Sequence, residues 1–85
     1  MKRYRFWWDD DNIEHIADHG VDPQEAEFVV IYARLTRKAG RGKYAAYGQT
    51  DAGRYLLVIF APKDHSVRVV TARDLTSKEK RRFRI

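Results

Sequence analysis

Any chemistry in this chain must come from arginine, lysine, tyrosine, histidine and glutamate side chains, because the 85-residue sequence contains no cysteine. The lack of cysteine excludes thiol nucleophiles, cysteine-ligated zinc, iron–sulfur clusters and disulfide scaffolds. The sequence also has no glycine-rich phosphate loop, no Ser-His-Asp order and no paired-carboxylate motif. Arginine stands out among the remaining groups, since its planar fork matches the oxygens of a phosphate.

Two of the three histidines are spaced like metal ligands. His15 and His19 are four residues apart and therefore share one face of a predicted helix. This spacing can ligate zinc, but there is no His-Glu-x-x-His motif and no third ligand stands out, so no metal and no cofactor is expected. His19, next to Gly20, is better explained as a cation at a helix C-terminus, and His15 keeps a secondary interpretation as a general base. His65 is expected in a turn and has no predicted role.

The charge is distributed unevenly along the chain. There are 17 Lys and Arg against 12 Asp and Glu, a net charge of +5. Between Asp9 and Glu27 every Asp, Glu, Lys or Arg is acidic, whereas from Phe28 onward basic residues dominate. A basic body beside an acidic segment is typical of a protein that binds a polyanion such as nucleic acid, although two ordinary solvated faces give the same pattern.

The length favours one domain covering residues 1–85, because two cores would each be too small to fold without disulfides or metal. The longest apolar runs, Phe28–Ala33 and Tyr55–Ala61, are far shorter than the ~20 residues needed to span a bilayer. No signal peptide is recognisable at the start of the sequence. We therefore expect a cytoplasmic protein with no membrane contact.

The first half of the chain predicts a short strand followed by two helices. Tyr4–Trp8 is aromatic and indicates a strand, and Asp9–Asp11 supply an N-cap and an acidic first turn for a helix that ends at Gly20. Asp22–Glu25 is a variant of the capping box with proline at the first helical position. It opens a second helix that is expected to run to Ala33.

The second half predicts an antiparallel meander and a last helix. Residues 34–42 indicate a short strand and a loop, and strands are expected at 43–50, 54–61 and 66–73, joined by turns at 51–53 and 62–65. The apolar strand 54–61 should be central and covered on both faces. Thr76 and Glu79 form a capping box for a basic C-terminal helix. The predicted fold class is α+β, with β-α-α followed by a meander of three to four strands and a C-terminal helix.

An ordered set of residues from about Phe6 to Phe83 resembles the BrnT family, the toxin component of bacterial type II toxin–antitoxin systems. No single motif in the set is specific, but the order of the motifs is. The set comprises Trp8-Asp9, Asn12, His15, His19-Gly20-Val21, Glu25-Ala26, Gly48, Gly53-Arg54, the Leu56–Phe60 strand, Arg68, Thr71-Ala72-Arg73, Thr76, Glu79 and Arg82-Phe83. The resemblance implies a RelE-like fold that acts as a metal-independent ribonuclease. It also implies a BrnA-type antitoxin encoded nearby, through which alone the complex would contact DNA.

The implied reaction requires a base for the ribose 2′-OH, cations to stabilise the phosphorane and an acid for the 5′-oxygen. Arg73, at the end of a predicted strand, is favoured as the phosphate ligand, and Arg68, Glu79 and Lys43 are the other candidate catalytic residues. Ideal strand alternation puts Arg68 and Arg73 on opposite faces unless a bulge intervenes or Arg73 has left the sheet. Arg73 is explained equally well by an ion pair with Asp9, Glu25 or Glu79. Glu79 is explained without catalysis by its capping role.

A wider set of basic and aromatic residues is predicted to bind nucleic acid. Tyr44 and Tyr47 fall on opposite faces of one strand, so at most one of them faces RNA. Arg54 has a simpler interpretation as an exposed arginine at the start of a strand. Phe6, Trp7 and Trp8 could stack on bases, although alternating aromatic residues on a first strand are more often core. The predicted nucleic-acid-binding residues are Arg37, Lys38, Arg41, Tyr44, Arg54, Lys80 and Arg81.

The sequence is compatible with three functions. The first is a ribonuclease toxin that cleaves RNA, either free or on the ribosome. The second is a module of the same fold that binds nucleic acid without cleaving it. The third is a protein-interaction subunit whose basic surface is covered by an acidic antitoxin.

Overall fold

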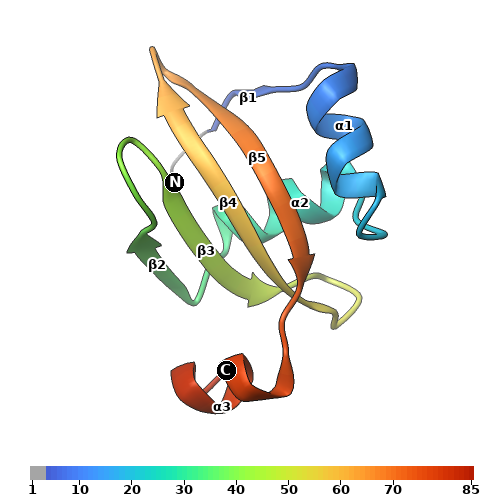
Figure 1. The fold of residues 1–85 in the computed structure, drawn as a ribbon, viewed down its shortest axis with the longest axis vertical. Helices are drawn as coiled ribbons and strands as arrows, with labels where there is room; N and C mark the ends of the chain where they lie inside the picture. Colours follow the sequence, from blue (N-terminus) through green and yellow to red (C-terminus); the bar gives the residue numbers. More distant parts are fainter. Residues whose placement is uncertain (1–3) are drawn as a thin grey trace.

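The computed structural model describes residues 4–85 and has an α+β fold, which confirms the predicted class. The elements in chain order are β1 (Phe6–Trp7), α1 (Asp10–Ala17), α2 (Pro23–Ile31), β2 (Leu35–Lys38), β3 (Tyr44–Gln49), β4 (Tyr55–Lys63), β5 (Ser66–Asp74) and α3 (Ser77–Phe83). A five-stranded sheet forms the centre of the fold, with α2 behind it, α1 beside its β5 edge and α3 beyond the end of β5, as Figure 1 shows. Within residues 4–85, no helix has the length and hydropathy needed to cross a bilayer.

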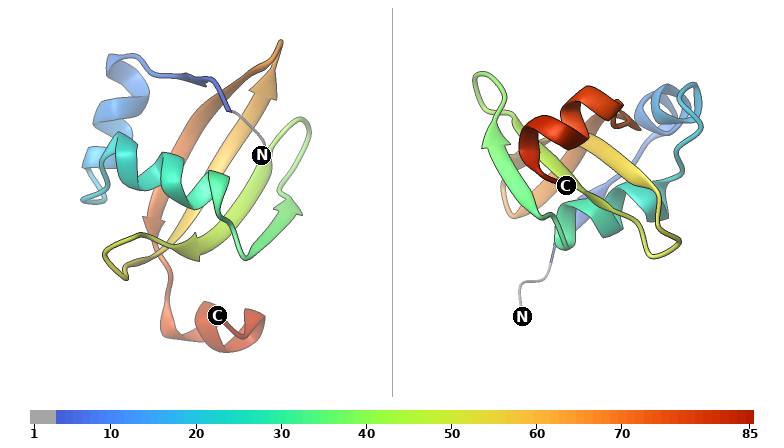
Figure 2. Two further views of the ribbon diagram at one scale, coloured as in Figure 1. Left: turned by 180° about the vertical axis from the view of Figure 1, so that it is seen from behind. Right: turned by 90° about the horizontal axis from the view of Figure 1, so that it is seen from below.

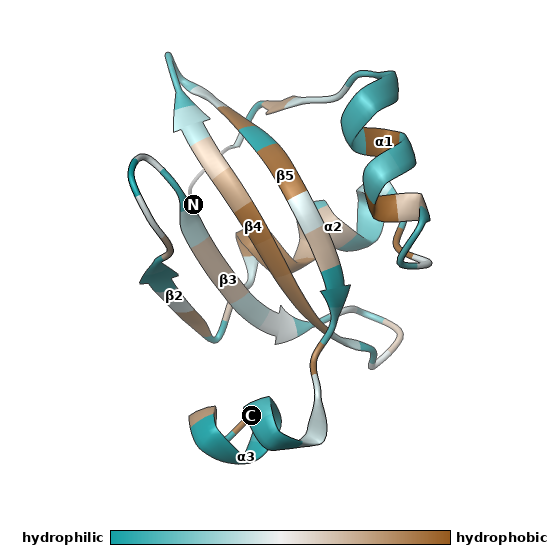
Figure 3. Cartoon of the chain, viewed as in Figure 1, coloured by the Kyte–Doolittle hydropathy of each residue, from teal (hydrophilic) through white to brown (hydrophobic). Residues whose placement is uncertain are grey.

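The strands lie in the order β1-β5-β4-β3-β2. Strands β2 to β5 form consecutive antiparallel pairs, which confirms the predicted meander. The short strand β1 joins the other edge and runs parallel to β5. Strand β4 is central and buries side chains on both faces, as predicted, and Figure 3 shows that it is hydrophobic along most of its length.

The main core lies between the sheet and the two N-terminal helices. Helix α2 crosses one face of the sheet and α1 lies beside the β5 edge, as the view from behind in Figure 2 shows, and both contribute residues to this core. Their apolar residues recur at helical spacing and meet the inward residues of the strands. The acidic segment of the sequence thus forms the outer surface of this helical layer. The core residues include Ile16, Val21, Ala26, Val29, Val30, Ala46, Leu56, Val58, Phe60, Val67, Val69 and Ala72.

Side-chain caps begin all three described helices. The predicted capping boxes Asp22…Glu25 and Thr76…Glu79 are both present. Asp9 is the N-cap of α1, and its partner Asn12 completes a further box that the sequence did not reveal. Gly20 adopts a φ of 70° after the last turn of α1, as expected for a terminating glycine. Helices α1 and α2 end at Ala17 and Ile31, earlier than predicted.

The turn between β4 and β5 is tighter than predicted. Only Asp64 and His65 form it, with φ values of 48° and 68°, so Pro62 and Lys63 belong to β4. The Val67 N–H donates to the carbonyl of Arg5, the residue before β1, at 2.8 Å. Pro62, which faces Val67 across the ladder, is therefore not required to supply an N–H. The predicted turn at 51–53 is correct, and Gly53 has a φ of 94°.

A bulge changes which side chains of β5 share a face. Ile59 pairs with Thr71 and Phe60 pairs with Val69, so Val70 is the extra residue. Val67 and Val69 point into the core before the bulge, and Ala72 does so after it. Arg68 and Arg73 therefore lie on the same face of the sheet, opposite the main core, although the Arg68 side chain reaches Asp9 at the start of α1. The sequence allowed Arg68 and Arg73 to share a face only if a bulge intervened or if Arg73 had left the sheet. The structure contains the bulge.

Candidate functional site

The face of the sheet opposite α2 and the main core, which we call the open face, carries a second apolar cluster. Ala45, Leu57 and Leu75 are buried there, and Tyr47, Tyr55, Ile59 and Ile85 pack against them. Helix α3 has no buried residue of its own and lies beyond the end of β5, as Figures 1 and 2 show. A few side-chain contacts therefore determine where this basic helix sits.

The strongest of these contacts is an ion pair between β5 and α3. Arg73 donates from Nη1 and Nη2 to the two carboxylate oxygens of Glu79, at 2.7 and 2.9 Å, and from Nη1 to the Asp74 carbonyl at 3.1 Å. The guanidinium of Arg73 holds the pKa of Glu79 at about 2, and the pair raises the pKa of Arg73. The Arg73 side chain is still 41% exposed, against 22% for Glu79. The Arg73 guanidinium is therefore held in a fixed orientation, while part of the side chain remains exposed to solvent.

Aromatic rings and further cations surround this pair. The rings of Tyr47 and Phe83 pack 4.6 Å apart, and Arg37 and Arg82 lie over the Phe83 ring at 5.2 and 5.5 Å. Arg34 and Lys80 lie in the same way over the Tyr55 ring. A hollow of about 250 Å³ is lined by Arg37, Tyr47, Lys78, Glu79, Arg82 and Phe83. The hollow combines a cationic rim with ring faces, a combination suited to single-stranded nucleic acid.

Arg68 lies near the other end of β5, roughly 15 Å from Arg73 along the strand. It donates from Nη1 and Nη2 to the carboxylate of Asp9, at 2.7 and 3.3 Å, and its guanidinium lies 5.2 Å from the centre of the Trp7 ring. The hydrogen bond lowers the pKa of Asp9. The prediction that Arg68 and Arg73 belong to one catalytic group therefore does not match the geometry.

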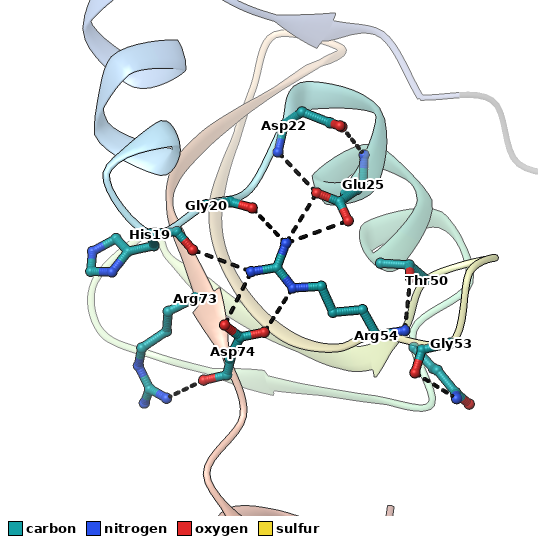
Figure 4. A network of polar contacts seen from close by, with 10 residues as sticks. His19, Gly20, Asp22, Glu25, Thr50, Gly53, Arg54, Arg73 and Asp74 are labelled. Carbon is teal, nitrogen blue, oxygen red and sulfur yellow. Dashed lines mark hydrogen bonds and ion pairs between the residues drawn. The ribbon is translucent and has the colours of Figure 1, made fainter.

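Arg54 is an internal connector rather than a free cation. Its guanidinium donates to Asp74 at 2.7 and 3.0 Å, to Glu25 at 3.3 and 3.5 Å, and to the carbonyls of His19 and Gly20, as Figure 4 shows. These bonds join the loop after α1, the start of α2 and the end of β5. The hydrogen bond to Asp74 raises the pKa of Arg54. With its donors used in this way, Arg54 does not fit the predicted nucleic-acid-binding role.

Tyr44 also lies away from the open face. It packs on the helical side of the sheet, with its ring 5.8 Å from that of Phe60, so it does not fit the predicted contact with RNA. Tyr47 is the tyrosine of β3 on the open face. Lys43 lies in the exposed turn before β3, toward the end of the sheet remote from Arg73, and does not join the Arg73–Glu79 pair.

The other predicted basic residues divide between two places. Arg37 and Lys80 contact the aromatic rings of the open face. Lys38 pairs with Tyr44 at the end of β2, and Arg41 follows in the exposed turn, so both lie at the rim of the sheet. Arg81 is exposed on α3. The site residues that were not predicted are Tyr47, Tyr55, Lys78, Arg82 and Phe83, of which Tyr47 could have been found from its alternation with the core residues Ala46 and Gly48.

The histidines form no metal site among residues 4–85, where no group of three or more His, Asp or Glu side chains is suited to hold an ion. The rings of His15 and His19 meet edge to face, 6.0 Å between centres. His19 lies after the last turn of α1, beyond the C-cap Asp18, and its backbone carbonyl accepts from Arg54.

Comparisons with known proteins were made for sequence and for structure. A sequence model of the family described as "Ribonuclease toxin, BrnT, of type II toxin-antitoxin system" matches residues 7–79. The fold is similar to the crystal structure, at 1.1 Å resolution, of the Brucella abortus ribonuclease toxin BrnT, with a TM-score of 0.71. The two chains share 22% sequence identity, and the match covers 88% of this chain and 100% of the other. No match was found among curated proteins.

Proposed function

The chain belongs to the BrnT family of ribonuclease toxins of type II toxin–antitoxin systems, and on that premise we propose a site and a mechanism for it. The proposed reaction is metal-independent cleavage of RNA, by attack of a ribose 2′-OH on the adjacent phosphate. The proposed site is the Arg73–Glu79 pair on the open face. The proposal rests on Arg73, which is oriented by the Glu79 carboxylate and partly exposed, and on the further cations that line the hollow with Glu79.

Arg73 is suited to stabilise the phosphorane. Three of the five N–H donors of a guanidinium are used within residues 4–85, two by Glu79 and one by the Asp74 carbonyl. The remaining donors can meet the oxygens on which negative charge develops in the transition state. An arginine already held in place pays little reorganisation when that charge appears.

Glu79 is suited to position Arg73 rather than to carry a proton. Its pKa of about 2 makes the carboxylate a weak base at neutral pH. Its two oxygens fix the plane of the guanidinium, while its capping bond to Thr76 N–H, at 2.9 Å, fixes the carboxylate on α3. Arg68 and Lys43 lie away from this pair, and we give them no part in the reaction.

The surrounding cations are suited to hold the phosphates on either side of the scissile bond. Arg37 and Arg82 line the hollow beside Glu79, and Lys80 lies one helical residue further along α3. Single-stranded RNA supplies both backbone charge and unstacked bases, whereas a duplex supplies only the charge at such a shallow surface. We therefore propose single-stranded RNA, free or on the ribosome, as the substrate.

The family implies an antitoxin partner. We propose that a BrnA-type antitoxin neutralises this chain by covering the open face, and that DNA is bound only through their complex. An acidic segment would complement the cations that line the hollow, and it would compete with RNA for them. RNA that displaces the antitoxin in a competition assay would support this arrangement. Simultaneous binding of both would contradict it.

The experiment that tests the reaction compares Arg73→Ala with the wild-type chain on a single-stranded RNA substrate. We expect the variant to lose roughly a hundredfold to a thousandfold in kcat, the usual cost of removing one group that stabilises transition-state charge. Wild-type products should carry 2′,3′-cyclic phosphate ends, and a chelator should not reduce the rate. Lys63→Ala, which removes an exposed cation at the far hairpin of the sheet, is the matched control.

Two outcomes would contradict the proposal. Wild-type protein that binds RNA without producing fragments would favour a non-catalytic binding module of the same fold. Equal cleavage by Arg73→Ala and Lys63→Ala would remove Arg73 from the reaction. Expression of the wild-type chain alone should also arrest growth, and Arg73→Ala should relieve that arrest.

A further inference from the structure

We propose that Trp7 and Arg68 form a second RNA subsite on the open face, one that stacks on a base of single-stranded RNA at a distance from the cleaved bond. The inference rests on the proposed function, since it extends the same substrate along the same face. No other part of the proposed mechanism uses these two residues.

The exposure of Trp7 is the first observation. Its side chain is 54% exposed, whereas its neighbours Phe6 and Trp8 both pack against the main core, Trp8 with its indole N–H bonded to Glu27 at 2.7 Å. A tryptophan costs free energy when it presents its ring to water, and a flat face of this kind is what a nucleobase stacks on.

The ring is also held in a defined position. The Asn12 side chain is buried and donates from Nδ2 to the carbonyls of Trp7 and Val69, both at 3.1 Å, which fixes β1 against β5. Arg68, opposite Trp7 in the ladder, lies 5.2 Å from the ring centre and is itself held by Asp9. Preorganisation of this kind lowers the entropic cost of binding a base.

The bulge at Val70 connects this feature to the proposed cleavage site. Without the extra residue, Arg68 and Trp7 would point to the face opposite Arg73. With it, the two ends of β5 present their arginines on one surface, roughly 15 Å apart. A single strand of RNA lying along β5 can therefore reach both ends.

The local charge indicates which part of the RNA fits here. Asp9 pairs with Arg68, and Asp11 lines a shallow hollow together with Arg68, so the surroundings of this pair repel a phosphate more than those of Arg73 do. A base is flat and uncharged, and it can stack on the indole without approaching these carboxylates. The subsite should thus add affinity without adding a phosphate contact.

The test measures affinity and its salt dependence together, using a single-stranded RNA oligonucleotide protected from cleavage by 2′-O-methyl groups. Trp7→Leu keeps apolar bulk but removes the aromatic face, and Trp7→Phe keeps a smaller one. We expect Trp7→Leu to weaken binding roughly tenfold to a hundredfold and Trp7→Phe to weaken it less. The slope of log K against log salt concentration should stay unchanged in both variants, because no phosphate contact is lost.

Tyr32→Leu is the matched control, because Tyr32 is 61% exposed at the C-cap of α2, on the other side of the sheet. Tyr32→Leu should bind the RNA oligonucleotide with the affinity of the wild type. The tryptophan fluorescence provides a second readout, since the chain has two tryptophans and Trp7→Phe leaves only Trp8. RNA should quench the wild-type emission and leave that of Trp7→Phe nearly unchanged.

The outcomes separate the subsite from the proposed function. Unchanged affinity in Trp7→Leu, together with weakened binding in Arg73→Ala, would overturn the subsite and leave the function standing. Weakened neutralisation by the antitoxin in Trp7→Leu, with RNA affinity unchanged, would also overturn it and assign Trp7 to the protein interface. Wild-type protein that does not bind RNA would overturn the proposed function and the subsite with it.

Discussion

Arg54, Arg68 and Arg73 each pair with a carboxylate, and their surroundings separate their roles. Arg54 is enclosed by two carboxylates and two backbone carbonyls, so its donors are used within the fold. Arg68 pairs with Asp9, and its guanidinium also lies over the exposed ring of Trp7. Within residues 4–85, Arg73 keeps donors that are not used, and its side chain is 41% exposed beside Glu79, which lines the hollow. An arginine that is paired but not enclosed is the kind that can still bind a phosphate.

The Arg73–Glu79 pair predicts a pH-dependent contribution to stability. Because the folded pKa of Glu79 is about 2, below its ordinary 4.5, the pair stabilises the fold above pH 4.5, and this contribution disappears as the pH falls toward 2. Glutamine at this position keeps the capping bond and removes the charge. We expect Glu79→Gln to lower the free energy of unfolding by about 1–2 kcal/mol near neutral pH, discounted for solvent exposure.

Urea unfolding of the wild type and of Glu79→Gln over this pH range checks the prediction. The difference between the two should be constant near neutral pH and should shrink between 4.5 and 2. A difference that stays constant down to pH 2 would mean that the charge of Glu79 does not stabilise the fold.

At the scale of elements, Arg54 joins parts of the chain that are distant in sequence. The loop after α1, the start of α2 and the end of β5 meet at its guanidinium (Figure 4). Arg54→Ala would leave two carboxylates close together without their cation. We expect it to lower the free energy of unfolding by about 2 kcal/mol, and Arg41→Ala in an exposed turn to change it by less than about 0.5 kcal/mol. Chemical denaturation measures both variants, and equal effects would contradict the connecting role.

The turn between β4 and β5 predicts a stabilising change. Asp64 and His65 both have positive φ, which fits a type I′ turn and favours Asn-Gly at these positions. The double variant Asp64→Asn, His65→Gly should raise the free energy of unfolding by about 0.5–1 kcal/mol. Ala52→Gly in the other turn, where the backbone is not left-handed, should lower it. Thermal unfolding of the wild type, the double variant and Ala52→Gly measures these differences in stability. A double variant less stable than the wild type would contradict the type I′ assignment.

Local patterns explain which elements could be predicted from the sequence. The Asp22…Glu25 and Thr76…Glu79 boxes, Gly20 and Gly53 carry their signals in a few neighbouring residues, and each is found where expected. The bulge at Val70 carries no such signal, because it depends on how two strands pair across the sheet. Arg68 was therefore grouped with Arg73, and the free cation predicted at Arg54 proved to be enclosed by residues distant in sequence.

The site itself was predictable only in part, for the same reason. Arg73 and Glu79 were both expected, and their contact follows from the short connection between β5 and α3. Tyr47, Arg82 and Phe83 come together because α3 turns back toward β3, a tertiary event with no local signature. Tyr44 was chosen in place of Tyr47 because strand alternation shows that the two differ in face without showing which face is open.

At the scale of the whole molecule, the charge asymmetry of the sequence becomes a difference between two faces. The acidic segment forms α1 beside the β5 edge and α2 across one face of the sheet, whereas Arg34, Arg37, Arg73, Lys80 and Arg82 gather on the open face near α3. Figure 3 shows both α1 and α3 as largely hydrophilic, although they carry opposite charge. RNA that approaches this chain is attracted to one face and repelled from the other, which favours productive encounters.

This arrangement predicts how the binding of RNA depends on salt. Each cation that neutralises a phosphate of a single strand contributes about 0.7 to the slope of log K against log salt concentration. We expect Arg37→Ala and Arg82→Ala each to reduce that slope by about this amount and the double variant to reduce it by about twice as much. Lys63→Ala at the far hairpin and Glu14→Gln on α1 should leave it unchanged. Fluorescence anisotropy with the cleavage-protected RNA at several salt concentrations measures the slopes, and an equal reduction by Lys63→Ala would mean that charge attracts RNA over the whole surface rather than to the open face.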